Sequence, residues 1–219
     1  MRAVRTVVYI DGFNLYYRAL KGSHHKWLNL AALCEAALPQ NCNIVAVNFY
    51  TARVSGIRNP SSPKDQNTYL KALATLPSVQ VHFGNFQANK AWMPLAQPIK
   101  FWPPGVFPYP IPESFCVVKT EEKGSDVNLG AHLVRDAFLG TFEHVAVITN
   151  DTDLKEPIRI VVEEARLPVT LLTPVPHPAA DLKKLATHIR NIEAYLGVSQ
   201  FPDPVISAGG QLIRKPVDW

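Results

Sequence analysis

Four aspartates of this sequence occupy positions from which a folded chain could bring their carboxylates together. They are Asp11, Asp126, Asp151 and Asp153. The first follows an apolar, β-branched stretch over 4–10, and the last two follow another over 144–149, each typical of a buried strand. The second lies at the start of a helix predicted over 125–139. Because ligands bind outside the carboxyl ends of parallel strands, we expect the four side chains to converge at one rim of a sheet.

A cluster of this kind cannot remain uncompensated. Two carboxylates about 4 Å apart repel by roughly 4 kcal/mol at an effective dielectric constant of about 20. Either some of them carry a proton or a cation neutralises them. Oxygen ligands suit Mg²⁺ or Mn²⁺ rather than zinc. A bound ion of this type can lower the pKa of a water and neutralise charge on phosphorus, which is the chemistry of a phosphodiesterase.

Each aspartate also has an ordinary structural explanation. Asp11-Gly12 is a common turn sequence, and Asp151 to Asp153 can cap a helix. Asp126 can complement the dipole of its helix. Their shared position at strand ends and at a helix start favours the metal site. Histidine ligands are not expected, because His24 and His25 lie together in a predicted loop.

The order of apolar segments predicts the architecture. Strands are predicted over 4–10, 43–50, 79–83, 144–149 and 169–172, regular structure over 115–118, and helices over 14–20, 28–38, 64–76, 125–139, 153–165 and 182–196. Asn14 and Ser125 are the predicted N-caps of their helices. This alternation indicates an α/β fold with a doubly wound, mainly parallel sheet. With 219 residues, 47% of them hydrophobic, the chain suits one domain over 1–198 and an irregular C-terminal tail over 199–219.

The segment 85–114 differs from the rest in being rich in proline and aromatic residues. Proline removes backbone donors, so 85–112 is predicted to be neither helix nor central strand. Many large rings argue for a structured insertion rather than a flexible linker. The rings either stack on RNA bases or pack onto the sheet edge; the relevant ones are Trp92, Phe101, Trp102 and Tyr109.

Charge and cysteine content restrict the partners and the compartment. The net charge of +4 permits a nucleic-acid partner without requiring one. Three cysteines without a CxxC spacing indicate neither a disulfide framework nor a zinc site, and free thiols suit the reducing cytoplasm. No apolar run reaches the length of about 18 residues that a membrane span needs, and the apolar run before Asp11 is too short for a signal peptide. The oligomeric state is not indicated.

Three motifs carry a family resemblance. Val8–Leu15 (VYIDGFNL), Lys123–Leu129 (KGSDVNL) and Val147–Leu154 (VITNDTDL) resemble, in this order, the three motifs of NYN domains, a branch of the PIN-like nucleases. The resemblance covers about 4–174. It implies a Mg²⁺- or Mn²⁺-dependent ribonuclease with a doubly wound parallel sheet. It also implies that the acidic set is Asp11, Asp126, Asp151 and Asp153, with Asn14 in support.

One position departs from the pattern. Many relatives carry another acid in the second-motif helix, where this chain has His132. Asp136 lies one turn later and could pair with His132. One metal ligand is thus in doubt, and with it a two-metal mechanism. The departure keeps open the alternative of an RNA-binding or regulatory module whose site is weak or inactive.

Other enzyme classes fit less well. A phosphatase of the haloacid dehalogenase type needs a second aspartate two residues after the first, where this chain has Phe13. No GxGxxG follows the first strand, which argues against a dinucleotide-binding domain. For the ribonuclease we expect single-stranded or looped RNA as substrate. Candidate contacts to its backbone are Arg53, Arg58, Lys64, Lys123 and Lys155.

Overall fold

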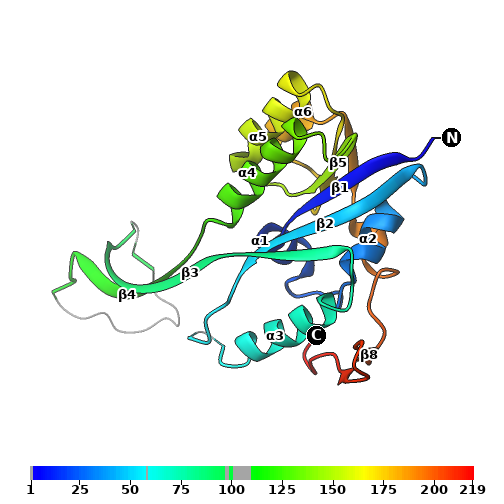
Figure 1. The fold of residues 1–219 in the computed structure, drawn as a ribbon. Coiled ribbons are helices and arrows are strands. Elements are labelled where there is room, and N and C mark those ends of the chain that lie inside the picture. The colour runs from blue at the N-terminus through cyan, green and yellow to red at the C-terminus, as the bar shows by residue number, and fades with distance from the viewer. Residues whose placement is uncertain (1, 58, 97–98, 101–109) are drawn as a thin grey trace.

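The computed structural model describes residues 2–57, 59–96, 99–100 and 110–219. Within them the chain forms an α/β fold around a seven-stranded sheet with the order β4-β3-β2-β1-β5-β6-β7 (Figure 1). Every pair of neighbours is parallel except β3 and β4. The predicted mainly parallel α/β sheet is confirmed. Its strands are β1 (Val4–Asp11), β2 (Cys42–Ala52), β3 (Val79–Pro94), β4 (Ser114–Lys123), β5 (His144–Ile148), β6 (Val169–Thr173) and β7 (His188–Asn191).

Helices cover both faces of the sheet, as Figure 1 shows for α2 and α3 on one side and α4 to α6 on the other. Two hydrophobic cores lie on the two faces of the sheet. Because side chains alternate along a strand, Val8 and Ile10 of β1 pack in one core, while Val7 and Tyr9 pack in the other. This explains why the central strands are apolar throughout. The helices are α1 (Gly12–Leu15), η1 (Tyr16–Leu20), α2 (Leu30–Ala37), α3 (Ser62–Leu73), α4 (Ser125–Phe138), η2 (Thr152–Leu154), α5 (Lys155–Arg159), η3 (Ile160–Glu164), α6 (Ala180–Leu185) and α7 (Glu193–Leu196).

The strand order places a switch point between β1 and β5. The chain adds β2 and β3 on one side of β1, and β5, β6 and β7 on the other. Such an arrangement is consistent with a doubly wound sheet, in which ligands bind outside the carboxyl ends of the two central strands. Asp11 ends β1 and Thr149 directly follows β5, so two of the predicted polar segments meet there.

The proline- and aromatic-rich segment corrects one prediction. Residues up to Pro94 continue β3 and pair antiparallel with β4, from Asn85 opposite Lys123 to Pro94 opposite Ser114. The resulting two-stranded ribbon extends away from the rest of the sheet (Figure 1). Most prolines of the segment follow the paired residues in the sequence, so the pairing up to Pro94 forms without them. Trp92 is 73% exposed on this ribbon, whereas Phe101, Trp102 and Tyr109 lie outside the described residues.

Two C-terminal segments also differ from the prediction. The helix predicted over 182–196 is interrupted, because His188–Asn191 pairs with β6 as the edge strand β7. The tail predicted to be irregular contains a small hairpin of β8 (Val205–Ile206) and β9 (Leu212–Ile213). Phe201 and one residue of each hairpin strand are buried in the core, so apolar packing rather than periodicity orders this segment. In the described ranges, none of the helices is long and apolar enough to cross a membrane.

Gly84 lies where the ribbon leaves the sheet and passes the start of α4. A Cβ atom there would lie 2.8 Å from the backbone nitrogen of Ser125 and 2.9 Å from the carbonyl oxygen of Lys123, and would also collide with Glu122. Because backbone atoms cannot rotate away, Gly84→Ala is expected to destabilise the fold by roughly 1–3 kcal/mol in urea denaturation. Gly209→Ala is the control, since no atom beyond its chain neighbours in the described structure lies within 4 Å of that position. Equal denaturation midpoints for the two variants would contradict this packing.

Candidate active site

Asp11 occupies the end of β1 and caps the helix that follows. Its Oδ1 accepts a hydrogen bond from the Asn14 backbone N–H at 2.9 Å, and its Oδ2 accepts one from the Thr149 hydroxyl at 3.1 Å. The side chain is only 3% exposed. Asp11, and not the predicted Asn14, is therefore the N-cap of α1. The aspartate is fixed in one orientation by both central strand ends.

Gly12 allows the chain to turn into α1 directly after Asp11. A Cβ atom at this position would lie 2.5 Å from the carbonyl oxygen of Tyr50 and 2.7 Å from the ring of Phe49. Both neighbours belong to β2, which runs beside β1. Only a hydrogen atom fits between the turn and this strand, so the glycine sets the position of Asp11.

Asn14 connects the two strand ends. Its Oδ1 accepts a hydrogen bond from the Asn150 N–H at 2.9 Å, and the Asn150 side chain in turn accepts one from the Ala179 N–H at 2.7 Å. The Thr149 hydroxyl also accepts a hydrogen bond from the Asp151 N–H at 3.0 Å. These bonds hold the loop after β5 against the loop after β1. Asn14 thus links the turn that carries Asp11 to the loop that carries Asp151.

Asp151 serves partly as a cap. Its Oδ1 accepts a hydrogen bond from the Asp153 N–H at 3.1 Å at the start of η2. Helix capping, the structural explanation considered for this motif, therefore accounts for Oδ1 of Asp151, whereas Oδ2 takes no part in this bond. Asp151 is half-buried, whereas Asp153 is exposed.

Asp126 lies in the first turn of α4, but the start of this helix differs from the prediction. The N-cap is Gly124, with φ of 94° in the left-handed region, instead of Ser125. The Ser125 N–H donates to Glu122 Oε1 at 2.9 Å. Sequence reasoning did not select Glu122, and the only signal for it is an acid just before the Lys123-Gly124 turn. Burial raises the pKa of Asp126, and the charge of Glu122 adds to this rise.

The acids act on one another electrostatically. Burial, followed by the negative charges of Asp126 and Asp151, raises the pKa of Asp11 to about 7 against the opposing effect of its hydrogen bonds. Burial also raises the pKa of Asp126, and the charges of Glu122, Asp151 and Asp153 add to this rise. The structure therefore brings Asp11, Asp126 and Asp151 within mutual electrostatic reach, with Asp153 contributing at the exposed side.

The donor set suits a hard cation that keeps part of its water. In the described part of the chain, none of the four aspartates forms an ion pair with a lysine or arginine. The same residues contain no group of three or more His, Cys, Asp or Glu side chains already placed to hold a metal ion. The donors available from the four aspartates are oxygens, the ligands that Mg²⁺ and Mn²⁺ prefer, and such an ion keeps several waters when one or two carboxylates bind it.

His132, on α4, contacts Tyr50 rather than the Asp136 side chain considered as its partner. Its Nδ1 is 2.9 Å from the hydroxyl of Tyr50, and its ring packs edge-on against His82. Asp136 accepts hydrogen bonds from the Tyr9 hydroxyl at 2.6 Å and from Arg135 Nε at 2.8 Å. The two side chains thus belong to a network between α4 and strands β1 to β3. This network takes the place of a His132–Asp136 pair.

The predicted basic contacts are mostly engaged. Lys155 pairs with Asp181 at 2.8 Å, and Lys123 lies 3.7 Å from Glu121. The guanidinium of Arg53 lies 4.6 Å from the centre of the Phe83 ring. Arg58 is outside the described residues. Exposed pairs of this type contribute about 0–1 kcal/mol, so a phosphate can replace the acid at small cost.

Comparisons with known proteins found one enzyme with a similar sequence and one protein with a similar fold. No family model matches the chain. It is 28% identical, over 99% of its own length and 75% of the other's, to a 6-hydroxy-3-succinoylpyridine 3-monooxygenase from Pseudomonas putida (strain DSM 28022 / S16). A protein of unknown function from Vibrio parahaemolyticus RIMD 2210633 has a similar structure, with a TM-score of 0.52 at 14% identity. That similarity covers 87% of this chain and 94% of the other, and it concerns the overall fold.

Proposed function

We propose that this chain is a PIN-like ribonuclease of the NYN type that uses Mg²⁺ or Mn²⁺ to hydrolyse phosphodiester bonds of RNA at the switch point between β1 and β5. One observation carries the proposal. Acids from three separate segments, after β1, at the start of α4 and after β5, lie close enough for their charges to raise the pKa values of Asp11 and Asp126, and in the described residues no lysine or arginine pairs with them. The three sequence motifs support it, because they contain these acids.

Each polar residue at this end of the sheet has a proposed role in binding the cation or the attacking water. Asp11 and Asp151 hold the cation, directly or through water, and Asp153 extends the negative field at the exposed side. Asp126, on a different element, holds the ion or orients the attacking water. Asn14 and Thr149 keep the two strand ends in register through the bonds described above. A bound divalent cation supplies an acidified water and neutralises charge on the phosphate.

Single-stranded or looped RNA is the proposed substrate. A phosphate must reach the rim together with its flanking nucleotides, and a flexible strand can bend to do so more easily than a duplex. The β3–β4 ribbon begins beside the site, because β4 ends at Lys123, directly before the turn into α4. Exposed rings such as Trp92 on this ribbon can stack on bases irrespective of sequence.

The direct test is a cleavage series. One sequence is presented as single strand, hairpin and duplex, each with Mg²⁺, Mn²⁺ or EDTA. Cutting is expected in the single strand and in the hairpin loop, only with a metal ion, and far less in the duplex. Equal cutting of all three forms, or cutting that persists in EDTA, would contradict the proposal. RNA binding without any cutting would instead support the alternative of a regulatory RNA-binding module.

The similarity to the pyridine monooxygenase favours a second candidate, oxygenation of a small heteroaromatic compound. The alignment spans nearly the whole chain, so the aligned region includes the segments that carry the four aspartates. Oxygen uptake with 6-hydroxy-3-succinoylpyridine and a reduced nicotinamide, compared with the same mixture lacking protein, tests this candidate. Substrate-dependent uptake would support it, and unchanged uptake would exclude this substrate.

A further inference from the structure

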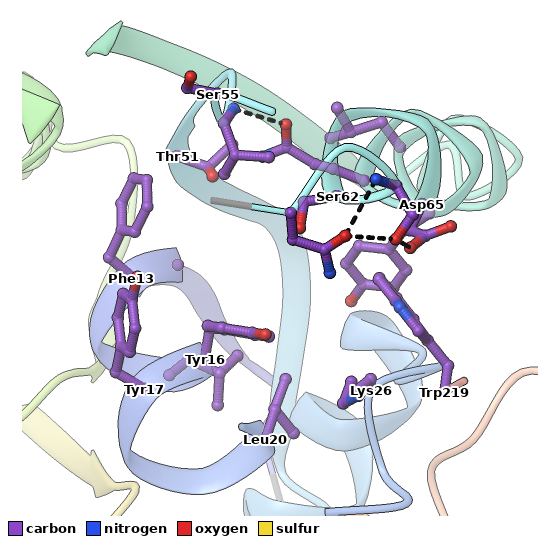
Figure 2. Close-up of a pocket in the computed structure, with 18 of the residues that line it drawn as sticks. Phe13, Tyr16, Tyr17, Leu20, Lys26, Thr51, Ser55, Ser62, Asp65 and Trp219 are labelled. Carbon is purple, nitrogen blue, oxygen red and sulfur yellow. Dashed lines mark hydrogen bonds between the residues drawn. The ribbon is translucent and has the colours of Figure 1, made fainter. Parts of the chain in front are cut away.

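A cavity of about 320 Å³ opens next to the start of α1, directly after Asp11 in the chain (Figure 2). Gly12 and Phe13, which directly follow Asp11, form one of its edges. Its other walls include η1, the end of β2, the loop between β2 and α3, one side of α3 and Trp219. The cavity has no role in the proposed nuclease reaction as described above. Its size lies at the lower end of the range for small-molecule pockets, so it suits one ring system with its substituents.

Aromatic rings dominate one wall of the cavity. The rings of Phe13 and Tyr17 are nearly parallel, with centres 6.4 Å apart, and Tyr16 meets Tyr17 edge-on at 5.3 Å. Tyr17 is 58% exposed, although it stands on the helix next to the candidate active site. Figure 2 shows Phe13 and Tyr17 on one side of the space and Trp219 on the other. Rings left exposed around one hollow are typical of a site that stacks a flat ligand.

The helix geometry contributes to this exposure. Residues Tyr16–Leu20 form a wide π-type turn, closed by a hydrogen bond from the Lys21 N–H to the Tyr16 carbonyl oxygen at 2.7 Å. Short π-type turns are rare, and they occur frequently at functional sites. Here the turn places consecutive tyrosines toward the same hollow, an arrangement that the 100° step of a regular α-helix does not favour.

The charges around the cavity argue against an anionic ligand. Lys26, the only lysine or arginine among its described lining residues, donates a hydrogen bond to the Asp218 carbonyl oxygen at 3.0 Å. Asp65 and the carboxylate of Asp218 are the acids of the lining. An added carboxylate or phosphate inside the cavity would therefore meet more negative than positive charge. A buried anion without a cation is costly, so an uncharged ligand fits better.

Polar groups for an uncharged heterocycle are present at the opposite end. Asn59 uses its carbonyl oxygen to accept bonds from the N–H and hydroxyl of Ser61, both at 3.0 Å. Its amide N–H groups have no partner in the described part of the chain and are available to a ring acceptor. Ser62 also lines the space and points into it in Figure 2. Such groups can hydrogen-bond the edge of a ring whose faces contact tyrosine.

We infer that this cavity binds an uncharged planar heteroaromatic ring, which during RNA cleavage is the base of the nucleotide next to the cleaved phosphate. The second half rests on the proposed ribonuclease function. Gly12 and Phe13 adjoin both the cavity and Asp11, so a base in the cavity holds its own phosphate at the rim. The site thus fixes the substrate by stacking one base, while the charged phosphate stays outside the cavity.

Two variants and a control test the ring site without metal. Ser62→Trp fills the cavity, and Tyr17→Ala removes a stacking face. Phe138→Ala is the control, because Phe138 is similarly exposed, at 61%, but lies at the far end of α4 from Asp126. In EDTA, adenosine and uridine are titrated into each protein by calorimetry, and melting temperatures verify folding. Both variants are expected to weaken binding of the nucleosides roughly 5- to 150-fold, and the control to leave it unchanged.

A second experiment separates a base of RNA from a free heterocycle. Short RNAs with one abasic residue at successive positions are bound in EDTA and then cut with Mn²⁺. One abasic position next to the cleaved bond is expected to reduce both binding and cutting in the wild type, and to have little further effect in Ser62→Trp. Abasic and intact RNA that behave alike would overturn the base assignment. A folded Ser62→Trp protein that binds nucleosides as the wild type does would overturn the ring site itself. Nucleoside binding without any RNA cutting would leave the ring site standing, overturn the assignment of its ring to a substrate base and contradict the ribonuclease proposal.

Discussion

Asp151→Asn is expected to lower Mn²⁺-dependent RNA cleavage by at least roughly a hundredfold while the fold remains intact. Asparagine keeps an Oδ1 that can accept the Asp153 N–H, so the cap of η2 survives. What disappears is a negative charge facing Asp11 and Asp126. Relief of that repulsion should stabilise the metal-free protein by on the order of 1–2 kcal/mol at this partly exposed position. Gel-based cleavage and thermal melting in EDTA measure the two effects separately.

The matched control for this variant is Asp203→Asn. Asp203 is an exposed aspartate whose Oδ1 also accepts a backbone N–H, that of Lys215 at 3.1 Å, and its charge is not among the causes of the raised pKa values of Asp11 and Asp126. Its replacement should leave cleavage unchanged. A large drop in the melting temperature of metal-free Asp151→Asn would mean that Asp151 is chiefly a structural cap. Undiminished cleavage by a folded Asp151→Asn protein would remove it from the site.

The positions of the acids could be predicted because they depend on local rules. A buried parallel strand is an uninterrupted apolar run, and the first polar residue after it marks the carboxyl end. Asp11 and Asp151 lie at such ends in the structure, as expected. α4, which carries Asp126, packs against β1 and β2. The positions of Asp11 and Asp151 at strand ends could therefore be predicted from local sequence patterns, whereas the packing of α4 required the structure.

The assignment of helix caps required the structure. Asp11 and Asn14 are both favourable N-caps, and the sequence does not show at which residue the helix starts. The decision depends on Gly12, whose missing side chain lets α1 begin immediately beside the Tyr50 carbonyl oxygen. The same holds at α4, where a left-handed Gly124 precedes Ser125 and the Glu122 side chain supplies the capping acceptor. Contacts with another segment decided both cases.

The β3–β4 ribbon and β7 could not be predicted because strand pairing overrides local propensity. Residues after Gly84 contain proline and few alternating apolar positions, yet they pair with Ser114–Lys123 from farther along the chain. His188–Asn191 lies within a pattern that resembled a helix, but the open edge of β6 takes it up as a strand. Backbone hydrogen bonding to a distant partner leaves little trace in a single sequence. The cavity beside Tyr17 was missed for a similar reason, since its walls come from separate segments.

The pH dependence of stability is expected to show the protonation of Asp11. Its pKa is raised from 3.8 to about 7 in the folded chain, so between these values the folded state binds more protons than the unfolded state. The contribution of Asp11 to stability is then fully present below about pH 4 and is lost as the pH rises through 7. Linkage sets its size at no more than about 4 kcal/mol over this range. Urea denaturation in EDTA at half-unit steps from pH 4.5 to 8 measures the loss.

Asp11→Asn isolates this contribution from the other titrating groups. His82 and His144 have pKa values lowered by burial, so they favour the folded state at higher pH and act in the opposite direction. The difference between the wild-type and variant curves removes them, and asparagine retains an oxygen for the Asn14 N–H. The wild type should lose stability relative to the variant as the pH rises to 7. Saturating Mn²⁺ should reverse this trend in the wild type alone, because the cation binds the ionised carboxylate and competes with its proton. Parallel curves for the two proteins in EDTA would mean that Asp11 is already ionised near pH 4, and that its burial needs no cation to balance it.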